Sequence, residues 1–187
     1  MKHVLGLAEI AHNVVGEGSA VMERRAATGV SDLSDVLVDD AELDRPLPNA
    51  ERLIAAAVTL TAARSDDPDL AALVAQYWRL VSDEELAGRT PANLRAATLS
   101  HLALADQRLP GQLKLRITAS DENAEQDEHT AIEIVTDDMP FLVDSVTAAL
   151  SARDVNIHLL AHPLVVVRRD PSGSLREIRT GVEPSDA

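Results

Sequence analysis

Residues 132–146 read IEIVTDDMPFLVDSV, and this stretch decides the fold class. Apolar and polar residues alternate from Thr130 to Thr136, so Ile132 and Ile134 share one face of an expected β-strand. A turn should follow at residues 137–140, because proline favours the first position of a helix. The expected helix spans about Phe141 to Arg153, with an apolar face made of Leu142, Val146, Ala149 and Leu150. The stretch predicts a strand, a turn and an amphipathic helix in direct succession.

Further strands are expected on both sides of this stretch. Residues 113–118 alternate as a half-buried strand does, with apolar side chains at Leu113, Leu115 and Ile117. A strand from Val155 to Arg169 should be broken near His162-Pro163, because proline cannot donate to a β-ladder. A turn at residues 170–173 leads to a further strand from Leu175 to Thr180. Residues 112–187 therefore predict a β-β-α-β module in which the helix packs on the sheet.

Helical patterns fill the sequence before this module. Glu51 to Arg64 has one apolar face, Asp67-Pro68 has the form of a helix start, and Thr90-Pro91 begins a helix that runs to about Gln107. The segment from His3 to Val15 also predicts a helix, because its apolar residues recur at helical spacing. We expect residues 1–111 to form a helical leader, of which residues 1–48 are weakly ordered or peripheral. The fold class is α+β with segregated helices.

Charge and composition exclude several classes of function. The chain has 31 acidic and 17 basic residues and a formal charge of −14, so it should not bind nucleic acid. Only 2% of its residues are aromatic, which is too few for a base-stacking platform. There are no cysteines, no secretory signal pattern, and no apolar stretch long enough to span a membrane. We expect a soluble cytoplasmic protein with no membrane partner.

No motif for catalysis, cofactor binding or metal binding is found in the sequence. It contains no G-x-S-x-G, no phosphate-binding G-x-x-x-x-G-K-[ST] and no H-E-x-x-H. His158 and His162 are four residues apart in an expected strand, which separates them by about 13 Å, too far for one ion unless a bulge lies between them. We therefore predict no catalytic, cofactor-binding or metal-binding residues in this chain.

The turn before the expected helix is the one candidate site. It comprises Asp137, Asp138, Met139, Pro140, Phe141 and Leu142. A helix N-terminus presents unpaired N–H groups, which suit a carboxylate or another small anion. Capping of the helix and packing against the sheet would explain the same residues without a ligand.

Four stretches together resemble the N-terminal region of the large bacterial NAD-specific glutamate dehydrogenases. They are residues 132–146, Asp83 to Pro91 (DEELAGRTP), Leu99 to Leu102 (LSHL) and Asn156 to Pro163 (NIHLLAHP). The likeness extends from about Leu70 to Asp170 and is weak before Asn49.

This resemblance implies a role outside catalysis. Those enzymes deaminate L-glutamate to 2-oxoglutarate with NAD, their catalytic domains lie far towards the C-terminus, and their N-terminal part contains ACT-like (ferredoxin-like) modules that sense amino acids or build the oligomer. The chain would be a helical leader plus the first such module. Its partners would be the remainder of the same enzyme chain and the other subunits of a homo-oligomer, with a small amino acid as an effector.

Two departures from the ACT pattern favour contact between domains or subunits over ligand binding. Amino-acid-binding modules read D-x-P-G-L at the turn, whereas this chain has Phe141 at the glycine position. The phenyl ring would fill the space of a ligand or form its apolar wall. After Thr180 only seven residues remain, so the module is atypical or truncated and has an exposed sheet edge. A free-standing ACT-like module that binds an amino acid, and a structural dimerisation domain, are the alternatives.

Overall fold

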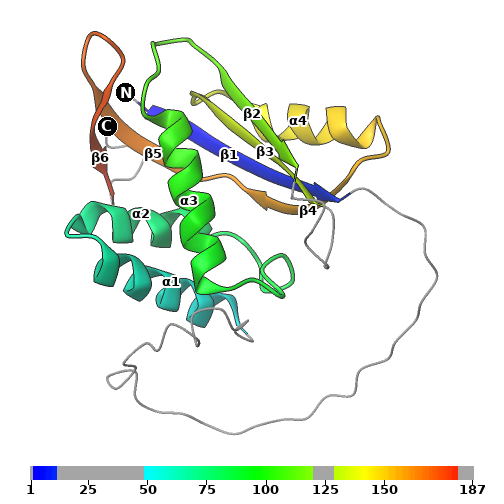
Figure 1. Cartoon of the computed structure of the whole chain (residues 1–187). Helices are drawn as coiled ribbons and strands as arrows, with labels where there is room; N and C mark the ends of the chain where they lie inside the picture. Colours follow the sequence, from blue (N-terminus) through cyan, green and yellow to red (C-terminus); the bar gives the residue numbers. More distant parts are fainter. Residues whose placement is uncertain (1, 12–48, 120–128, 181–187) are drawn as a thin grey trace, which may run out of the picture.

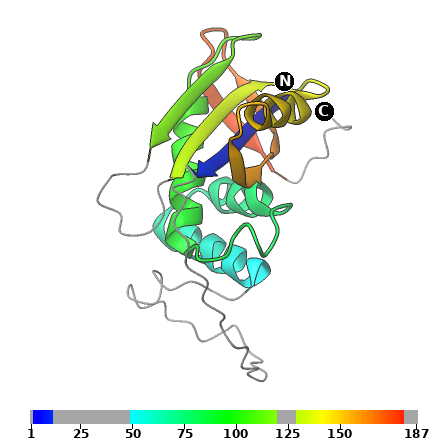
Figure 2. The same ribbon diagram turned by 90° about the vertical axis from the view of Figure 1, so that its right-hand side faces the viewer.

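The computed structural model describes residues 2–11, 49–119 and 129–180, which form one sheet with helices on both faces (Figures 1 and 2). The α+β class predicted from the sequence is confirmed. In chain order the elements are β1 (Lys2–Ala11), α1 (Ala50–Arg64), α2 (Pro68–Trp78), α3 (Pro91–Ala105), β2 (Lys114–Ala119), β3 (His129–Asp137), α4 (Leu142–Ser151), β4 (Asn156–Ala161), β5 (Leu164–Arg169) and β6 (Leu175–Arg179).

The sheet is antiparallel at every strand pair among the described residues. Its order is β2-β3-β1-β5-β6, and β4 also pairs with β1. β4 and β5 lie along different parts of β1 and are separated by His162-Pro163, which confirms the predicted break in this strand. Because β3 and β4 are both antiparallel to β1, they run parallel to each other, and α4 connects them across β1.

β1 overturns the helix predicted from His3 to Val15. Lys2–Ala11 is a strand between β3 on one side and β4 and β5 on the other, and residues 12–15 lie outside the described residues. The helical spacing was misleading because the apolar residues of β1 do not alternate with polar ones, as they would in a half-buried strand. Gly6, a poor residue for a helix interior, was the contrary signal.

The helices α1, α2 and α3 begin where the sequence predicts them. The side chain of Asn49 accepts from the Arg52 N–H, and that of Asp67 accepts from the Asp69 N–H. Thr90 and Asn93 form a reciprocal capping box at the start of α3. Each cap satisfies amide groups that the first helical turn cannot pair by itself.

One apolar core joins these three helices to the sheet. Leu53, Leu73, Trp78 and Leu94 of the helices are buried against the sheet residues Val135, Leu159 and Val165. The helices lie on the face of the sheet opposite to α4 (Figures 1 and 2). The predicted domain boundary between residues 111 and 112 stays a prediction, and the predicted peripheral character of residues 12–48 falls outside the described residues.

A buried histidine forms hydrogen bonds between the helices and the sheet in this core. His101 of α3 is fully buried; its Nδ1 lies 2.8 Å from the Tyr77 hydroxyl of α2, and its Nε2 lies 3.1 Å from the Ile134 carbonyl oxygen of β3. Burial lowers the pKa of His101 to about 4, so the ring is neutral at pH 7. The neutral ring donates a hydrogen bond from Nε2 to the Ile134 carbonyl oxygen and accepts a hydrogen bond from the Tyr77 hydroxyl at Nδ1.

None of the described helices is both long and apolar enough to cross a membrane.

Candidate functional site

The predicted turn at residues 137–142 connects β3 to α4, and its first aspartate has a structural role. The carboxylate of Asp137 lies 2.8 Å from the guanidinium of Arg108, whose side chain is fully buried. Its second oxygen accepts the Gly111 N–H at 2.8 Å. Through this ion pair and this hydrogen bond, Asp137 holds the loop after α3 against the end of β3. Asp138 is exposed and lies close enough to His162 to influence the protonation of that ring.

Phe141 adopts the backbone conformation that glycine would normally supply at this turn. Its φ is +63°, in the left-handed region, and it is the N-cap residue of α4 without a capping side-chain hydrogen bond. The helix therefore begins at Leu142, one residue later than predicted. Pro140 lies two residues before this start, and Phe141 with its left-handed backbone stands between them. The phenyl ring is 75% exposed. The ring lines a small hollow that also includes His162.

The α4 face of the sheet has several apolar side chains that the described residues leave exposed. Leu115 and Ile117 of β2 pair with Ile134 and Ile132 of β3, while Arg116 between them turns to the other face and donates to the Ser100 carbonyl of α3. On the α4 face Leu113, Leu115 and Ile117 are 60%, 54% and 62% exposed. The alternation of β2 was predicted correctly, but its apolar side is not the buried side.

α4 leaves this surface open because it packs beside β4 and not over β2. Its apolar residues Leu142, Val146 and Leu150 are only half-buried, and no residue of the helix is buried. The predicted apolar face of α4 therefore exists but lacks a full counterpart. We call the exposed side chains of Leu113, Leu115, Ile117 and Phe141, together with the apolar side of α4, the open face.

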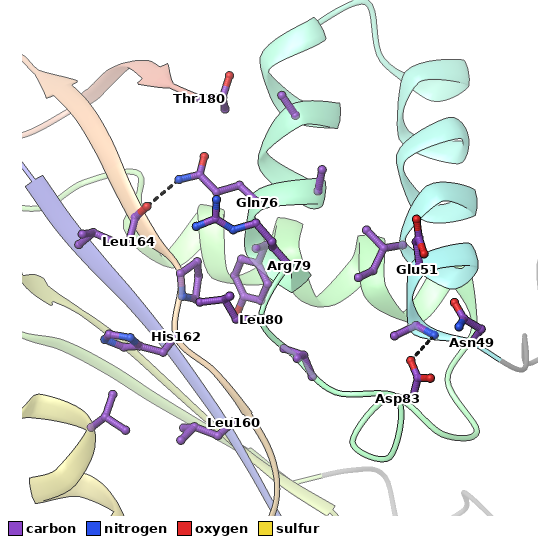
Figure 3. Close-up of a pocket in the computed structure, with 18 residues that line it drawn as sticks. Asn49, Glu51, Gln76, Arg79, Leu80, Asp83, Leu160, His162, Leu164 and Thr180 are labelled. Atoms are coloured by element: carbon purple, nitrogen blue, oxygen red, sulfur yellow. Dashed lines mark hydrogen bonds between the residues drawn. The ribbon is translucent and has the colours of Figure 1, made fainter. Parts of the chain in front are cut away.

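A groove of about 1180 Å³ lies between α1, α2 and the β4–β5 break (Figure 3). Apolar residues form much of its wall, among them Ile54, Leu80 and Leu160. Its polar groups include Gln76 and Arg79 from the end of α2 and His162 from the break. The Gln76 amide donates to the Leu164 carbonyl oxygen at 2.7 Å, which ties α2 to the first residue of β5.

A smaller hollow of about 180 Å³ lies next to the groove and belongs to the predicted turn. It is lined by Met139, Phe141, Leu142, Val143, Asp144 and His162, and the groove shares Val143 and His162 with it. Partial burial lowers the pKa of His162, and the negative charge of Asp138 opposes this shift. The turn that the sequence singled out therefore stands at one end of the groove.

Sequence reasoning found the turn but missed the groove. Gln76 and Arg79 are three residues apart at the end of a helix, so they could have been placed on one face. Nothing in the sequence indicates that the break at His162-Pro163 lies opposite to them. His158 is exposed on β4, and the described residues contain no group of three side chains able to hold a metal ion.

The comparison with known proteins identifies the family. Residues 73–187 match the family model described as "Glutamate dehydrogenase, ACT1 domain". The chain is 35% identical over 113 residues to the NAD-specific glutamate dehydrogenase of Pseudomonas aeruginosa, and 35% identical over 109 residues to that of Halomonas elongata. These matches cover 59% and 57% of this chain but only 7% of each relative. No solved structure matches the chain.

The family match confirms the resemblance drawn from the four sequence stretches. The matched residues include β2, β3, the turn at residues 137–142, α4 and the strands that follow. The chain belongs to the family of the ACT1 domain of glutamate dehydrogenase.

Proposed function

We propose that this chain is a non-catalytic assembly domain of an NAD-dependent glutamate dehydrogenase. The reaction, oxidation of L-glutamate to 2-oxoglutarate with NAD, would take place in other parts of that enzyme. Both relatives bear the name NAD-specific glutamate dehydrogenase, and this chain matches a small part of each. The partners of the domain would be the remainder of the same enzyme chain and the other subunits of a homo-oligomer.

The open face is the observation that favours assembly. Leu115 and Ile117 of the edge strand β2, and Leu113 just before it, are more than half exposed, and α4 on the same face of the sheet has no buried residue. Contiguous exposed apolar surfaces of this kind are typical of protein interfaces. The outer edge of β2 also has backbone groups that pair with no other described strand.

The turn at residues 137–142 belongs to the same proposal. Its most exposed apolar residue, Phe141, projects beside α4, where it can contact a neighbouring domain. The Asp137 carboxylate is already bound to Arg108 and to a backbone N–H, so it is less suited to holding the ammonium group of an amino acid. These contacts favour an interface over an effector site at this turn.

The test is a charge placed in the open face of the glutamate dehydrogenase that contains this domain. Leu115→Glu should weaken assembly and lower glutamate-dependent NADH formation at dilute enzyme, because a buried unpaired carboxylate is costly at an apolar interface. Analytical ultracentrifugation and absorbance at 340 nm report the two effects. Thr118→Glu is the matched control, since Thr118 is exposed on the same strand but faces the other side. Normal assembly of the Leu115→Glu enzyme would refute the proposal.

A further inference from the structure

The hairpin formed by β5 and β6 contains more arginines than carboxylates. Between Leu164 and Arg179 it has four basic and two acidic residues, which are Arg168, Arg169, Arg176, Arg179, Asp170 and Glu177. The whole chain has a formal charge of −14, so this excess of positive charge is local. Such a region attracts a small anion that the net charge of the chain would otherwise repel.

Two of these arginines share one carboxylate. Arg168 Nε donates to Glu177 Oε2 at 2.7 Å, and Arg179 Nε donates to Glu177 Oε1 at 3.1 Å. Arg168 is paired with Glu177 across the two strands, and Arg179 is two residues further along β6, so the three side chains lie on the same face of the hairpin. Hydrogen bonds from the two arginines lower the pKa of Glu177, which keeps it ionised at neutral pH. Glu177 therefore holds the two guanidinium groups next to each other.

The outer nitrogens of both guanidinium groups remain available as donors. Each group donates to Glu177 through Nε alone, and its Nη1 and Nη2 form no hydrogen bond with any described residue. The side chains of Arg168 and Arg179 are 59% and 53% exposed, so a molecule in solution can reach them. The planar fork of a guanidinium group suits a phosphate or a carboxylate, to which it donates two parallel hydrogen bonds.

Arg168 and Arg179 line a hollow of about 370 Å³. Arg169 also lines this hollow, and Asp170 is its one acidic lining residue in the described part of the chain. The Asp170 carboxylate is already bound, because Arg176 donates to it at 2.6 Å and the turn between the strands donates further hydrogen bonds to it. The charges around the hollow therefore favour an anion.

Protection of the sheet edge explains only part of this arrangement. β6 is an edge strand, and charged side chains on an edge prevent pairing with strands of other molecules. One arginine would be enough to pair with Glu177, yet two donate to it. The guanidinium group of Arg169 donates to the backbone carbonyl oxygens of Ala105 and Asp106. The carboxylates of Asp106 and Asp137 offset part of its charge, and the second arginine at Glu177 leaves positive charge for a ligand.

We propose that the β5–β6 hairpin binds a phosphate group, either free or as part of a small soluble ester. The outer nitrogens of Arg168 and Arg179 donate to the phosphate oxygens, Glu177 positions the two guanidinium groups, and the hollow receives the rest of an ester. A phosphate group has three acceptor oxygens and a charge of about −2 at pH 7, so it can engage both arginines at once. β6 and β2 lie at opposite ends of the sheet (Figure 1), so this site can fail while the assembly function stands, and the reverse.

Titrations of the whole chain followed by ¹H–¹⁵N NMR test the class of ligand. The probes are inorganic phosphate, glycerol 3-phosphate and succinate, a dicarboxylate of similar charge, all at constant ionic strength. We expect saturable shifts of the β5 and β6 amide signals with both phosphates, and an affinity about tenfold weaker for succinate, whose oxygens are divided between two distant groups. Tighter binding of glycerol 3-phosphate than of inorganic phosphate supports an ester as the ligand, and the reverse supports free phosphate. Shifts that do not saturate, or equal binding of succinate, would overturn the proposal.

Single variants assign the contacts. Arg168→Gln and Arg179→Gln should each weaken the binding of inorganic phosphate about tenfold, because each removes the charged hydrogen bonds of one guanidinium group. Arg153→Gln is the matched control, since it changes the net charge equally at an exposed arginine that follows α4 and does not line the hollow. It should bind phosphate like the unmodified chain.

Circular dichroism monitors the folding of the three variants. Arg168 and Arg179 are more than half exposed, so both glutamine variants should keep the fold. Unchanged phosphate binding by either folded variant would contradict the assignment. Equal weakening by Arg153→Gln would also overturn the proposal, because the effect would then come from net charge alone.

Discussion

His101 is buried in its neutral form, and each of its ring nitrogens has a partner of its own. Its position between Tyr77 and Ile134 joins two helices to the central strands. The other residue with a fixed local role is Gly173, whose φ of +91° brings its backbone against the Arg108 carbonyl. A single change at either residue, protonation of the His101 ring or addition of a Cβ at Gly173, should therefore lower the stability of the fold.

Acid should destabilise the fold through His101. Its pKa is about 4 in the folded chain and 6.5 in the unfolded chain, so below pH 6.5 the unfolded state takes up a proton that the folded state refuses. The contribution is complete above pH 6.5 and is lost as the pH falls towards 4. Between pH 7.5 and 5.0 we expect the free energy of unfolding to fall by about 2 kcal/mol from this group.

Urea unfolding at the two pH values measures this loss. His101→Gln should show a smaller pH dependence than the unmodified chain, whereas His158→Gln, a change at an exposed histidine, should show the same dependence. Equal pH dependence of the His101→Gln variant and the unmodified chain would show that another group is responsible.

Gly173→Ala should destabilise the chain more than a change at another left-handed glycine. A Cβ at this position would lie 2.7 Å from the Arg108 carbonyl oxygen, so the two backbone segments must separate. Gly88→Ala is the matched control, because φ there is +78° but nothing lies within 4 Å of the added carbon. We expect a cost of about 1 kcal/mol at Gly88, and about 2 kcal/mol more at Gly173. Similar melting temperatures of the two variants would contradict this contact.

At the scale of elements, the turn between β3 and α4 places a bulky residue in a conformation that disfavours it. Phe141→Gly should stabilise the isolated chain by about 1 kcal/mol, because the strain at φ +63° disappears and the ring is mostly exposed. Phe141→Ala also removes the ring but keeps the strained φ, so it should leave stability nearly unchanged. Thermal unfolding compares them. Destabilisation by both changes would mean that the ring contributes to packing.

The sequence predicted most elements, and the failures have physical causes. The caps at Asp67 and Thr90 are local signals, so α2 and α3 begin where expected. β1 depends on pairing with β3, more than 100 residues away, and no local pattern records that partner. For β2, alternation gave the strand but could not say which side would be covered, since this depends on where α4 lies.

Part of the candidate site could likewise be predicted from local sequence, and part could not. The turn at residues 137–142 was visible because proline, acidic residues and an amphipathic helix stand together in the sequence. The groove depends on Gln76 meeting the Leu164 carbonyl 88 residues later, which only the folded chain reveals. Phe141 was expected to fill a ligand space or to form its apolar wall; its ring lines the smaller hollow and is 75% exposed, and whether a ligand lies there stays a prediction.

At the scale of the whole molecule, the sheet is well covered on one face and thinly covered on the other. α1, α2 and α3 share a buried core with the sheet, while α4 stands alone on its face among the described residues. This asymmetry supports the proposed assembly function, because exposed apolar side chains gathered on one face are typical of a surface that a partner covers. The proposed assembly function depends on this difference in coverage between the two faces of the sheet.

Amide hydrogen exchange in the enzyme that contains this domain, compared with exchange in the isolated chain, tests the central claim most directly. We predict slower exchange in the enzyme at residues 114–119 and 142–151, the two elements of the open face, and little change in α1 and α3. Equal exchange at β2 and α4 in both would contradict the account, because the open face would then be exposed to water in the assembled enzyme as well.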